Sequence, residues 1–332
     1  MTEDDRGRGA VSMAVLGCAD IAWRRTLPAL RGQPRLRLAA LASRDLRRAR
    51  EFAARFGGVP VTDYQHVLDR DDIDAVYLPL PPALHEEWAC RALRAGKHVL
   101  VEKPMATSAG AAERMLALAR EQDRWLVENM MIAHHGQHAA VRGLIAAGRI
   151  GQPRGLTGVF GIPPRPPTDF RYDPALGGGA LLDLGVYPLR AAALLLPGEW
   201  EPAGAALRVD QRTGVDLSGH ALLRGALGSV AHVSFGFEFA YRCAYSIWGA
   251  EGRLVLDRAF TPPPTRRPVI RIERGGHVEE LPLHAEDQFA ASLRAFADAV
   301  LDGRPPAHDA TDVLAQARLV DKVRARAVEI PV

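Results

Sequence analysis

The stretch Ser12-Met-Ala-Val-Leu-Gly17-Cys-Ala-Asp-Ile-Ala22 decides the fold of the first part of the chain. Its apolar beginning predicts a short strand, and the helical spacing of apolar residues from Ile21 to Leu30 predicts a helix directly after it. The turn between them fits G-x-A-x-x-A, a degenerate dinucleotide-binding fingerprint. Gly17 permits the tight turn, position 19 carries an alanine in place of the glycine that lets backbone approach a pyrophosphate, and Ala22 permits close packing of helix on strand. The N–H groups at the start of such a helix can bind phosphate.

Strands and helices alternate beyond this turn. Apolar runs predict strands over residues 36–41, 75–78, 98–101 and 125–127, and the segments between them predict helices over 45–56, 84–94 and 109–121. This alternation is typical of an α/β fold with a parallel sheet and right-handed crossovers. We therefore predict a dinucleotide-binding Rossmann domain over residues 11–128.

The pattern changes after Asn129. A helix is predicted to end over 141–147, and a strand over 155–160. Strand-like runs separated by Gly or Asp turns then predict antiparallel meanders, and the stripe Phe289, Leu293, Phe296 and Val300 predicts a helix near the end. The runs lie at 203–209, 219–227, 229–237, 243–248, 253–256, 269–272 and 278–283. Residues 129–332 are thus expected to form a second domain with a large, mostly antiparallel sheet.

Composition excludes several classes of function. The 332 residues carry a net charge of +3 and no basic block, so nucleic-acid binding has no support. The longest apolar runs, such as 191–197, are too short to span a membrane, and residues 1–10 have no apolar signal segment. We therefore expect a cytoplasmic protein. The three widely spaced cysteines predict neither a disulfide framework nor a zinc site; they are Cys18, Cys90 and Cys243.

The sequence Glu102-Lys103-Pro104 follows the strand over 98–101. Lysine occurs only three times among the 42 basic residues of the chain, which makes an ammonium at this place conspicuous. In an open α/β sheet, ligands bind at the carboxyl ends of the strands. A compact point charge suits the oxygen of a single carbonyl. Lys103 is therefore a candidate catalytic residue, and the alternative is a solvated lysine on a surface turn.

Residues at other strand ends are candidates to bind the dinucleotide. Ser43 and Arg44 stand where a chain that selects the unphosphorylated cofactor usually has an acid, and their hydroxyl and guanidinium groups suit a 2′-phosphate, which favours NADP(H). Asp45 keeps the other cofactor open, although it also fits a helix cap. His85 either lines the cofactor cleft or caps a helix, and Arg24 either reaches the diphosphate or lies on a solvated face. The predicted cofactor set is Gly17, Cys18, Ala19, Asp20, Ile21, Trp23, Arg24, Ser43, Arg44, Leu80, Pro81, His85, Glu102 and Lys103.

A glycine run precedes a second pair of candidate residues in Gly177-Gly-Gly-Ala-Leu-Leu-Asp183-Leu-Gly-Val-Tyr187-Pro188. The glycines permit unusual backbone and the close approach of a ligand. Asp183 and Tyr187 are four positions apart, so on a helix they would share one face. A carboxylate and a phenol directed into one cleft would form an acid/base and orienting pair. The alternative is a capped helix with a core tyrosine.

The motifs Gly17-Cys-Ala, Glu102-Lys-Pro104 and Asp183-x-Gly-x-Tyr187 resemble those of the glucose–fructose oxidoreductase/inositol dehydrogenase/MocA (Gfo/Idh/MocA) family, and the resemblance covers essentially the whole chain. The turn Trp248-Gly-x-x-Gly-Arg-Leu is also usual there. Four stretches are most similar to the sugar-nucleotide 3-ketoreductases of deoxysugar pathways: Leu16-Gly-Cys-Ala-Asp-Ile-Ala-Trp-Arg-Arg25, Glu128-Asn129-Met, His134-His135-x-Gln137-His138 and the glycine run to Pro188.

The resemblance implies reduction of the C3 ketone of a dTDP-3,4-diketo-2,6-dideoxyhexose with NADPH. It places Lys103 and Tyr187 at the reacting carbonyl, Lys103 polarising it and Tyr187 donating the proton. Many dehydrogenases of the wider family have His where Tyr187 stands, and a phenol, with a reference pKa of about 10, holds a proton to donate at pH 7. The resemblance also implies an open-faced second sheet that forms a homo-oligomer, a dimer or tetramer.

The predicted substrate set is Lys103, Asn129, Arg165, Arg171, Asp183 and Tyr187. Arg165 and Arg171 are expected to meet the substrate diphosphate, unless their proline-rich loop is merely solvated. No metal is expected at His134, His135 and His138, because no acid or cysteine completes a ligand set.

Two rival functions stay open. One is an NAD(P)-dependent dehydrogenase of a free sugar or inositol, and the other is a non-catalytic regulator that senses the dinucleotide. Retention of both Lys103 and Tyr187 argues against the regulator, since a sensor has no need of a proton donor.

Overall fold

The computed structural model describes residues 9–332 except Pro197, Ala307 and Asp309. Most of the N-terminal segment in which no signal was predicted, and the end of the apolar run 191–197, lie outside the described residues. The chain divides into two compact units. Unit 1 comprises the chain up to Ala106, Gly110–His134 and Gln288–Val313, and unit 2 comprises Thr107–Ala109, His135–Asp287 and Leu314–Val332. The expected domains, 11–128 and 129–332, did not anticipate that the chain returns to unit 1 near its end.

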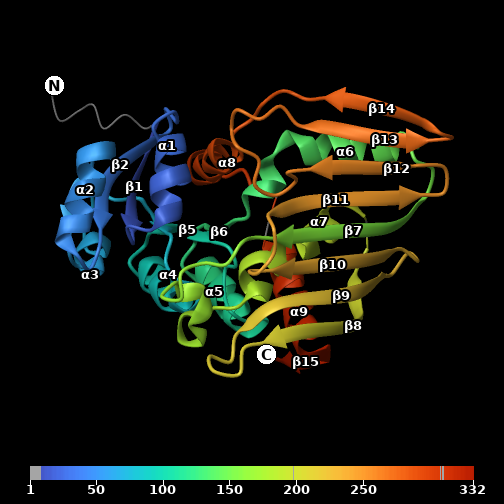
Figure 1. Cartoon of the computed structure of the whole chain (residues 1–332). Helices are drawn as coiled ribbons and strands as arrows, with labels where there is room; N and C mark the ends of the chain where they lie inside the picture. The colour runs from blue at the N-terminus through green and yellow to red at the C-terminus, as the bar shows by residue number, and fades with distance from the viewer. Residues whose placement is uncertain (1–8, 197, 307, 309) are drawn as a thin grey trace. The chain divides into compact units, whose positions relative to one another are not determined.

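Unit 1 is built on a six-stranded parallel sheet with the order β3-β2-β1-β4-β5-β6 (Figure 1). This is the strand order of a Rossmann fold, so the predicted fold is confirmed. The strands are β1 (Val11–Leu16), β2 (Leu36–Ala42), β3 (Val59–Val61), β4 (Ala75–Leu78), β5 (His98–Glu102) and β6 (Leu126–Asn129). The apolar runs found β1, β2, β4, β5 and β6. They missed β3, which is three residues long and contains a proline.

Except for a short helix over residues 64–68, which was not predicted, the α-helices of unit 1 lie close to the predicted ranges. They are α1 (Leu27–Leu30), which continues the π-helical turn η2 (Ala22–Thr26), then α2 (Leu46–Phe56), α3 (Tyr64–Leu68), α4 (His85–Arg94), α5 (Ala109–Glu121) and α8 (Gln288–Asp302). The returning helix α8 contacts β1, α1 and η2. The Arg35 side chain, just before β2, pairs with Asp298 and Asp302 of α8. The first unit is therefore completed by residues far along the chain.

Unit 2 contains a nine-stranded sheet in the order β14-β13-β12-β11-β7-β10-β9-β8-β15 (Figure 1). Its pairs are antiparallel except β7–β10 and β8–β15, which confirms the mostly antiparallel prediction. The strands are β7 (Pro153–Gly161), β8 (Trp200–Val209), β9 (Asp216–Gly225), β10 (Val230–Gly236), β11 (Arg242–Gly249), β12 (Arg253–Asp257), β13 (Val269–Arg274), β14 (His277–Pro282) and β15 (Ala327–Pro331). The sequence analysis missed the edge strand β15.

One face of this sheet carries helices, and the other leaves side chains exposed. The turn η7 (Leu181–Gly185) contacts β7, β9 and β10, and α7 (Val186–Leu195) contacts β7 and β10. The remaining α-helices are α6 (Gly136–Ala146), which agrees with the helix predicted to end over 141–147, and α9 (Ala310–Arg326), which the sequence analysis did not predict. On β10 the side chains alternate between buried Ala231 and Val233 and exposed Val230 and His232.

The helical stretch Pro174–Leu195 is long and apolar enough to cross a membrane by length and composition alone. Its apolar window is 78% buried within the protein, and it includes η7 and α7, which pack on the sheet. The stretch is therefore a core helix of unit 2.

Candidate functional site

The dinucleotide turn of unit 1 has the backbone that the sequence predicts. Gly17 has φ +113°, and a Cβ there would lie 2.7 Å from Cδ2 of Leu80, so the loop after β4 packs directly on this turn. The Arg48 side chain donates a hydrogen bond to the carbonyl of Cys18 at 2.7 Å. Burial raises the pKa of Cys18 to about 11, so its thiol stays neutral and contributes packing to the turn.

The end of β2 distinguishes the two interpretations of Asp45. Its carboxylate accepts a hydrogen bond from the N–H of Arg47 at 2.9 Å and caps α2. The hydroxyl of Ser43 accepts from the N–H of Asp45 at 3.2 Å, while Arg44 is exposed. The acid beside this strand end is thus used by the helix, as capping predicts.

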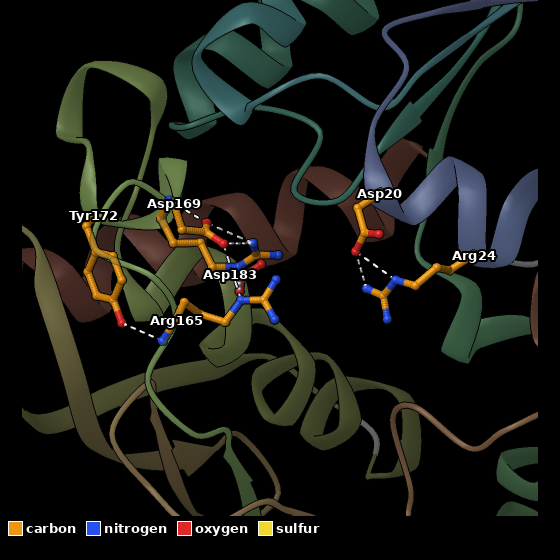
Figure 2. A network of polar contacts seen from close by, with 7 residues as sticks. Asp20, Arg24, Arg165, Asp169, Tyr172 and Asp183 are labelled. Atoms are coloured by element: carbon orange, nitrogen blue, oxygen red, sulfur yellow. Dashed lines mark hydrogen bonds and ion pairs between the residues drawn. The ribbon is translucent and has the colours of Figure 1, made fainter. Parts of the chain in front are cut away.

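Arg24 and Asp20, at the start of the first helix, form an exposed ion pair of 2.6 Å (Figure 2). The pairing reduces the positive charge that Arg24 presents. Exposed pairs of this kind are weak, so a phosphate can compete for the guanidinium.

His85 is fully buried and is the first residue of α4. Its ring nitrogens are 2.8 Å from the carbonyl oxygen of Leu80 and 2.9 Å from that of Pro104. The ring therefore links the loop after β4 to the loop after β5. Burial lowers the pKa of His85, although hydrogen bonds to the carbonyls of Leu80 and Pro104 oppose that shift.

Glu102, at the end of β5, is buried in a polar cluster of unit 1. Its Oε1 accepts from the Tyr77 hydroxyl at 2.6 Å and from the Asn129 amide at 2.6 Å. Burial raises its pKa, and those hydrogen bonds and the charge of Lys103 oppose the shift. Glu102 and Asn129 were predicted to contact cofactor and substrate, and the structure uses both side chains to fix the turn that carries Lys103. The Lys103 side chain itself is half-buried.

In unit 2, the protein itself fills the space that the glycine run leaves open. A Cβ on Gly178 would lie 2.5 Å from the carbonyl oxygen of Arg171, and one on Gly179, at φ +115°, would lie 2.3 Å from Oδ1 of Asp216. The Asp216 carboxylate accepts from the N–H of Leu181 at 2.6 Å and so caps the helix that follows. Burial raises the pKa of Asp216 to about 6. The glycines are required by these contacts.

Asp183 and Tyr187 lie in the first two turns of this helix. Residues Leu181–Gly185 form a π-helical turn, which has more residues per turn than an α-helix. The Asp183 carboxylate accepts from Nε of Arg171 at 2.5 Å. Tyr187 is 5% exposed, and its ring packs against Phe160 and Phe260 at centroid distances of 5.2 and 5.8 Å.

The two arginines of the proline-rich loop differ. Arg171 pairs with both Asp169 and Asp183, and these carboxylates raise its pKa further, so its charge is fully balanced within unit 2. Arg165 is exposed; it pairs with Asp169 at 3.2 Å, and its N–H donates to the Tyr172 hydroxyl at 3.0 Å. Figure 2 shows Arg165, Asp169, Tyr172 and Asp183 in this network. Arg165 is the better placed of the two to meet an anion.

The histidines at 134–138 have structural partners. His135 caps α6 by accepting from the N–H of Gln137, and His138 lies 3.0 Å from the hydroxyl of Tyr245. Burial lowers the pKa of His138 to about 3, so it is neutral. Within the described ranges, His, Cys, Asp and Glu form no group of three or more that could hold a metal ion.

Sequence reasoning missed four residues around these groups: Thr26, Tyr77, Asp216 and Ser292. They act through contacts between elements distant in sequence. Asp216 follows an apolar valine at the start of a strand, and nothing near it in the chain indicates a helix cap. Of these four residues, only Tyr77 could have been noticed in the sequence, because it is the one polar residue in an otherwise apolar strand.

Comparisons with known proteins give matches over both units. Residues 11–130 match the Gfo/Idh/MocA oxidoreductase family with an NAD-binding Rossmann fold, and residues 138–255 match the C-terminal domain of that family. A dTDP-3,4-didehydro-2,6-dideoxy-α-D-glucose 3-reductase from Actinomadura kijaniata is 50% identical over 328 residues, 99% of both chains.

A crystal structure of a 3-ketoreductase from Actinomadura kijaniata in complex with NADP and TDP-benzene has a TM-score of 0.95 at 51% identity, covering 97% of this chain and 99% of that one. Structures of that enzyme with a lysine replaced by alanine and with a tyrosine replaced by phenylalanine are equally similar in sequence, at 49% and 50% identity, with TM-scores of 0.92 and 0.95. Each also covers 97% of this chain and 99% of that one. The two substituted residues are each numbered one lower than Lys103 and Tyr187 are here.

Proposed function

The chain belongs to the Gfo/Idh/MocA oxidoreductase family, and from this premise we propose that it reduces the C3 ketone of a dTDP-linked keto-deoxysugar with NADPH. The observation that carries the proposal is 50% identity, over 99% of both chains, to a dTDP-3,4-didehydro-2,6-dideoxyglucose 3-reductase. Lys103 and Tyr187 stand at the positions that correspond to the lysine and tyrosine substituted in the solved relative.

The residues present fit NADP(H). The Gly17 turn leads into a helix that starts at Asp20, whose carboxylate accepts a hydrogen bond from the Arg24 side chain. The N–H groups at the start of such a helix can bind phosphate. Ser43 and Arg44 would hold the 2′-phosphate, because Asp45 is already used as a helix cap. When bound, this cofactor supplies the hydride.

Side chains of the protein then stabilise and neutralise the negative charge that develops on the ketone oxygen. Lys103 stabilises the developing negative charge with its ammonium, and Tyr187 delivers the proton from its phenol. Arg165 binds the diphosphate of the sugar nucleotide, and Arg171 fixes the orientation of Asp183. Removal of one preorganised donor of this type typically raises the activation free energy by about 3–4 kcal/mol.

The test is NADPH oxidation by the purified protein with a dTDP-linked 3-ketosugar. We expect turnover with NADPH to exceed turnover with NADH. Lys103→Ala and Tyr187→Phe are each expected to lower kcat by about 10²–10³-fold, while NADPH affinity changes by less than about twofold. Absence of turnover with the nucleotide sugar, together with oxidation of free sugars or inositol, would favour the dehydrogenase. NADPH binding without turnover of either substrate class would favour the regulator.

The open face of the sheet in unit 2 supports a homo-oligomer. Trp248 on β11, Val230 on β10 and Leu222 on β9 are 70%, 41% and 39% exposed. Trp248 and Val230 line a depression together with Gly155 and Thr157 of the intervening strand β7. A second copy of this chain is the occupant that we propose, giving a dimer or tetramer in the cytoplasm. Trp248→Glu should lower the mass measured by sedimentation. Leu227→Glu, in the turn between β9 and β10, should leave that mass unchanged.

A further inference from the structure

The turn that carries Lys103 is held on both sides by buried side chains of unit 1. Before it, Glu102 accepts from Tyr77 and Asn129 at 2.6 Å each. After it, the N–H of Met105 donates to Oε1 of Glu128 at 2.7 Å, and the His85 ring lies against the carbonyl of Pro104. The backbone on both sides of Lys103 is therefore fixed by side chains of other strands and helices.

These hydrogen bonds form a chain with a defined direction. Two donors converge on one oxygen of Glu102, so Tyr77 must donate its proton to that carboxylate. Thr26, at 2.9 Å, must then donate to the Tyr77 oxygen. On the other side, Ser292 donates to Oδ1 of Asn129 at 2.7 Å, which orients the amide so that its NH₂ group faces Glu102. Each of the five side chains is buried.

Two of the supports come from the returning segment, Gln288–Val313. Ser292 of α8 reaches Asn129 across 163 positions of sequence, and His308 lies 2.8 Å from Oε2 of Glu128 across 180 positions. Both partners lie at or just before the end of β6, beside the Lys103 turn on β5. The returning segment thus reaches both sides of the turn. Asn129 connects it to Glu102 before Lys103, and Glu128 connects it to the N–H of Met105 after Lys103.

We propose that Ser292 and His308 are positioning residues for Lys103: Ser292 acts through Asn129 and Glu102, and His308 acts through Glu128 and the N–H of Met105. The proposal rests on the reductase function proposed above. It gives the returning segment a role in turnover beyond packing, since a small displacement of a preorganised charge costs much of its effect on the transition state.

A double-mutant cycle tests the route through Lys103. Ser292→Ala should lower kcat by about 10-fold, with NADPH affinity changed by less than about twofold, and Ser292→Thr, which keeps the hydroxyl, should restore most of it. In the Lys103→Ala background, Ser292→Ala should change kcat by less than about twofold. Arg294→Ala, on the exposed face of α8, is the matched control. Equal losses from Ser292→Ala in both backgrounds would overturn the proposal, because the serine would then act independently of Lys103.

A second measurement is independent of activity and of folding yield. The chain has only three lysines, so ¹³C-methylation gives three lysine NMR signals beside that of the N-terminal amine. Lys103→Arg identifies the Lys103 signal. We expect Glu102→Gln, which keeps the acceptor oxygen, and His308→Ala to shift or broaden this signal, and Arg294→Ala to leave it unchanged. A Lys103 signal identical in wild type and both variants would contradict the inference, and a shifted signal in a protein without ketoreductase activity would contradict only the proposed function.

Discussion

Two glycine turns in this molecule share one local geometry and use it differently. Gly17 in unit 1 and Gly179 in unit 2 have φ of +113° and +115°, and each precedes a helix that begins with a π-helical turn. In unit 2 a carboxylate from β9, that of Asp216, occupies the helix N-terminus. In unit 1 the residue packed on the glycine is the apolar Leu80. The comparison teaches that a glycine-rich turn indicates a close approach, and that only the structure shows whether a ligand or the protein makes it.

Gly179→Ala should have the largest effect on stability. The new Cβ would lie 2.3 Å from a buried carboxylate oxygen, at a φ that L-residues avoid, so we expect a loss of about 3 kcal/mol in the free energy of unfolding. Gly214→Ala is the control, because it has φ +75° with nothing within 4 Å and should cost only about 1 kcal/mol. Urea denaturation measures both. Equal losses would mean that backbone strain alone, and not Asp216, makes the glycine necessary.

Asp216→Asn should lower the free energy of unfolding by an amount that depends on pH. The pKa of Asp216 is raised from 3.8 to about 6 in the folded protein, so its contribution is fully present below pH 3.8 and is lost as the pH rises through 6. The variant should therefore be less stable relative to wild type at pH 4 than at pH 7, by about 2–3 kcal/mol. Taking the difference between variant and wild type at each pH removes the contribution of other carboxyl groups. A constant difference would show that the carboxyl group is not shifted.

Gly17→Ala should cost less than Gly179→Ala, although φ is nearly the same. Its Cβ would meet the end of a flexible Leu80 side chain, which can move, so we expect about 1–2 kcal/mol from the backbone conformation. The larger consequence is for binding, because the Leu80 loop would be pushed from the dinucleotide turn. NADPH titration by fluorescence should show a dissociation constant raised by about 10-fold or more, and unchanged affinity would remove this turn from the cofactor site.

Asp45→Ala should have the smallest effect. Asp45 is a carboxylate cap like Asp216, but it is exposed, and removing such a cap costs about 1 kcal/mol. Selectivity for NADPH over NADH should not fall, whereas Arg44→Ala should reduce it. If Asp45→Ala changed the choice of cofactor, its carboxylate would act on the ribose as well as on the helix.

The sequence was sufficient to predict the architecture of both units and the side chains proposed for the site. Continuous apolar runs predicted the strands of unit 1, and turn residues predicted the meanders of unit 2. Short elements such as β3 and late ones such as α9 and β15 escaped, because a three-residue strand carries no periodicity and α9 has a weak apolar stripe. The supports of the site escaped for another reason: Thr26, Asp216 and Ser292 act on side chains or backbone that the fold alone brings to them.

The return of the chain to unit 1 has a consequence for synthesis. Helix α8 packs on β1 and α1, yet it leaves the ribosome after almost the whole of unit 2. Strands β1 to β6 can pair early in synthesis. The surface that α8 covers stays exposed to solvent until some 150 further residues have been synthesised. A fragment cut after β6 would keep that surface uncovered, so the first unit is expected to be recoverable alone only when the distant helix is joined to it.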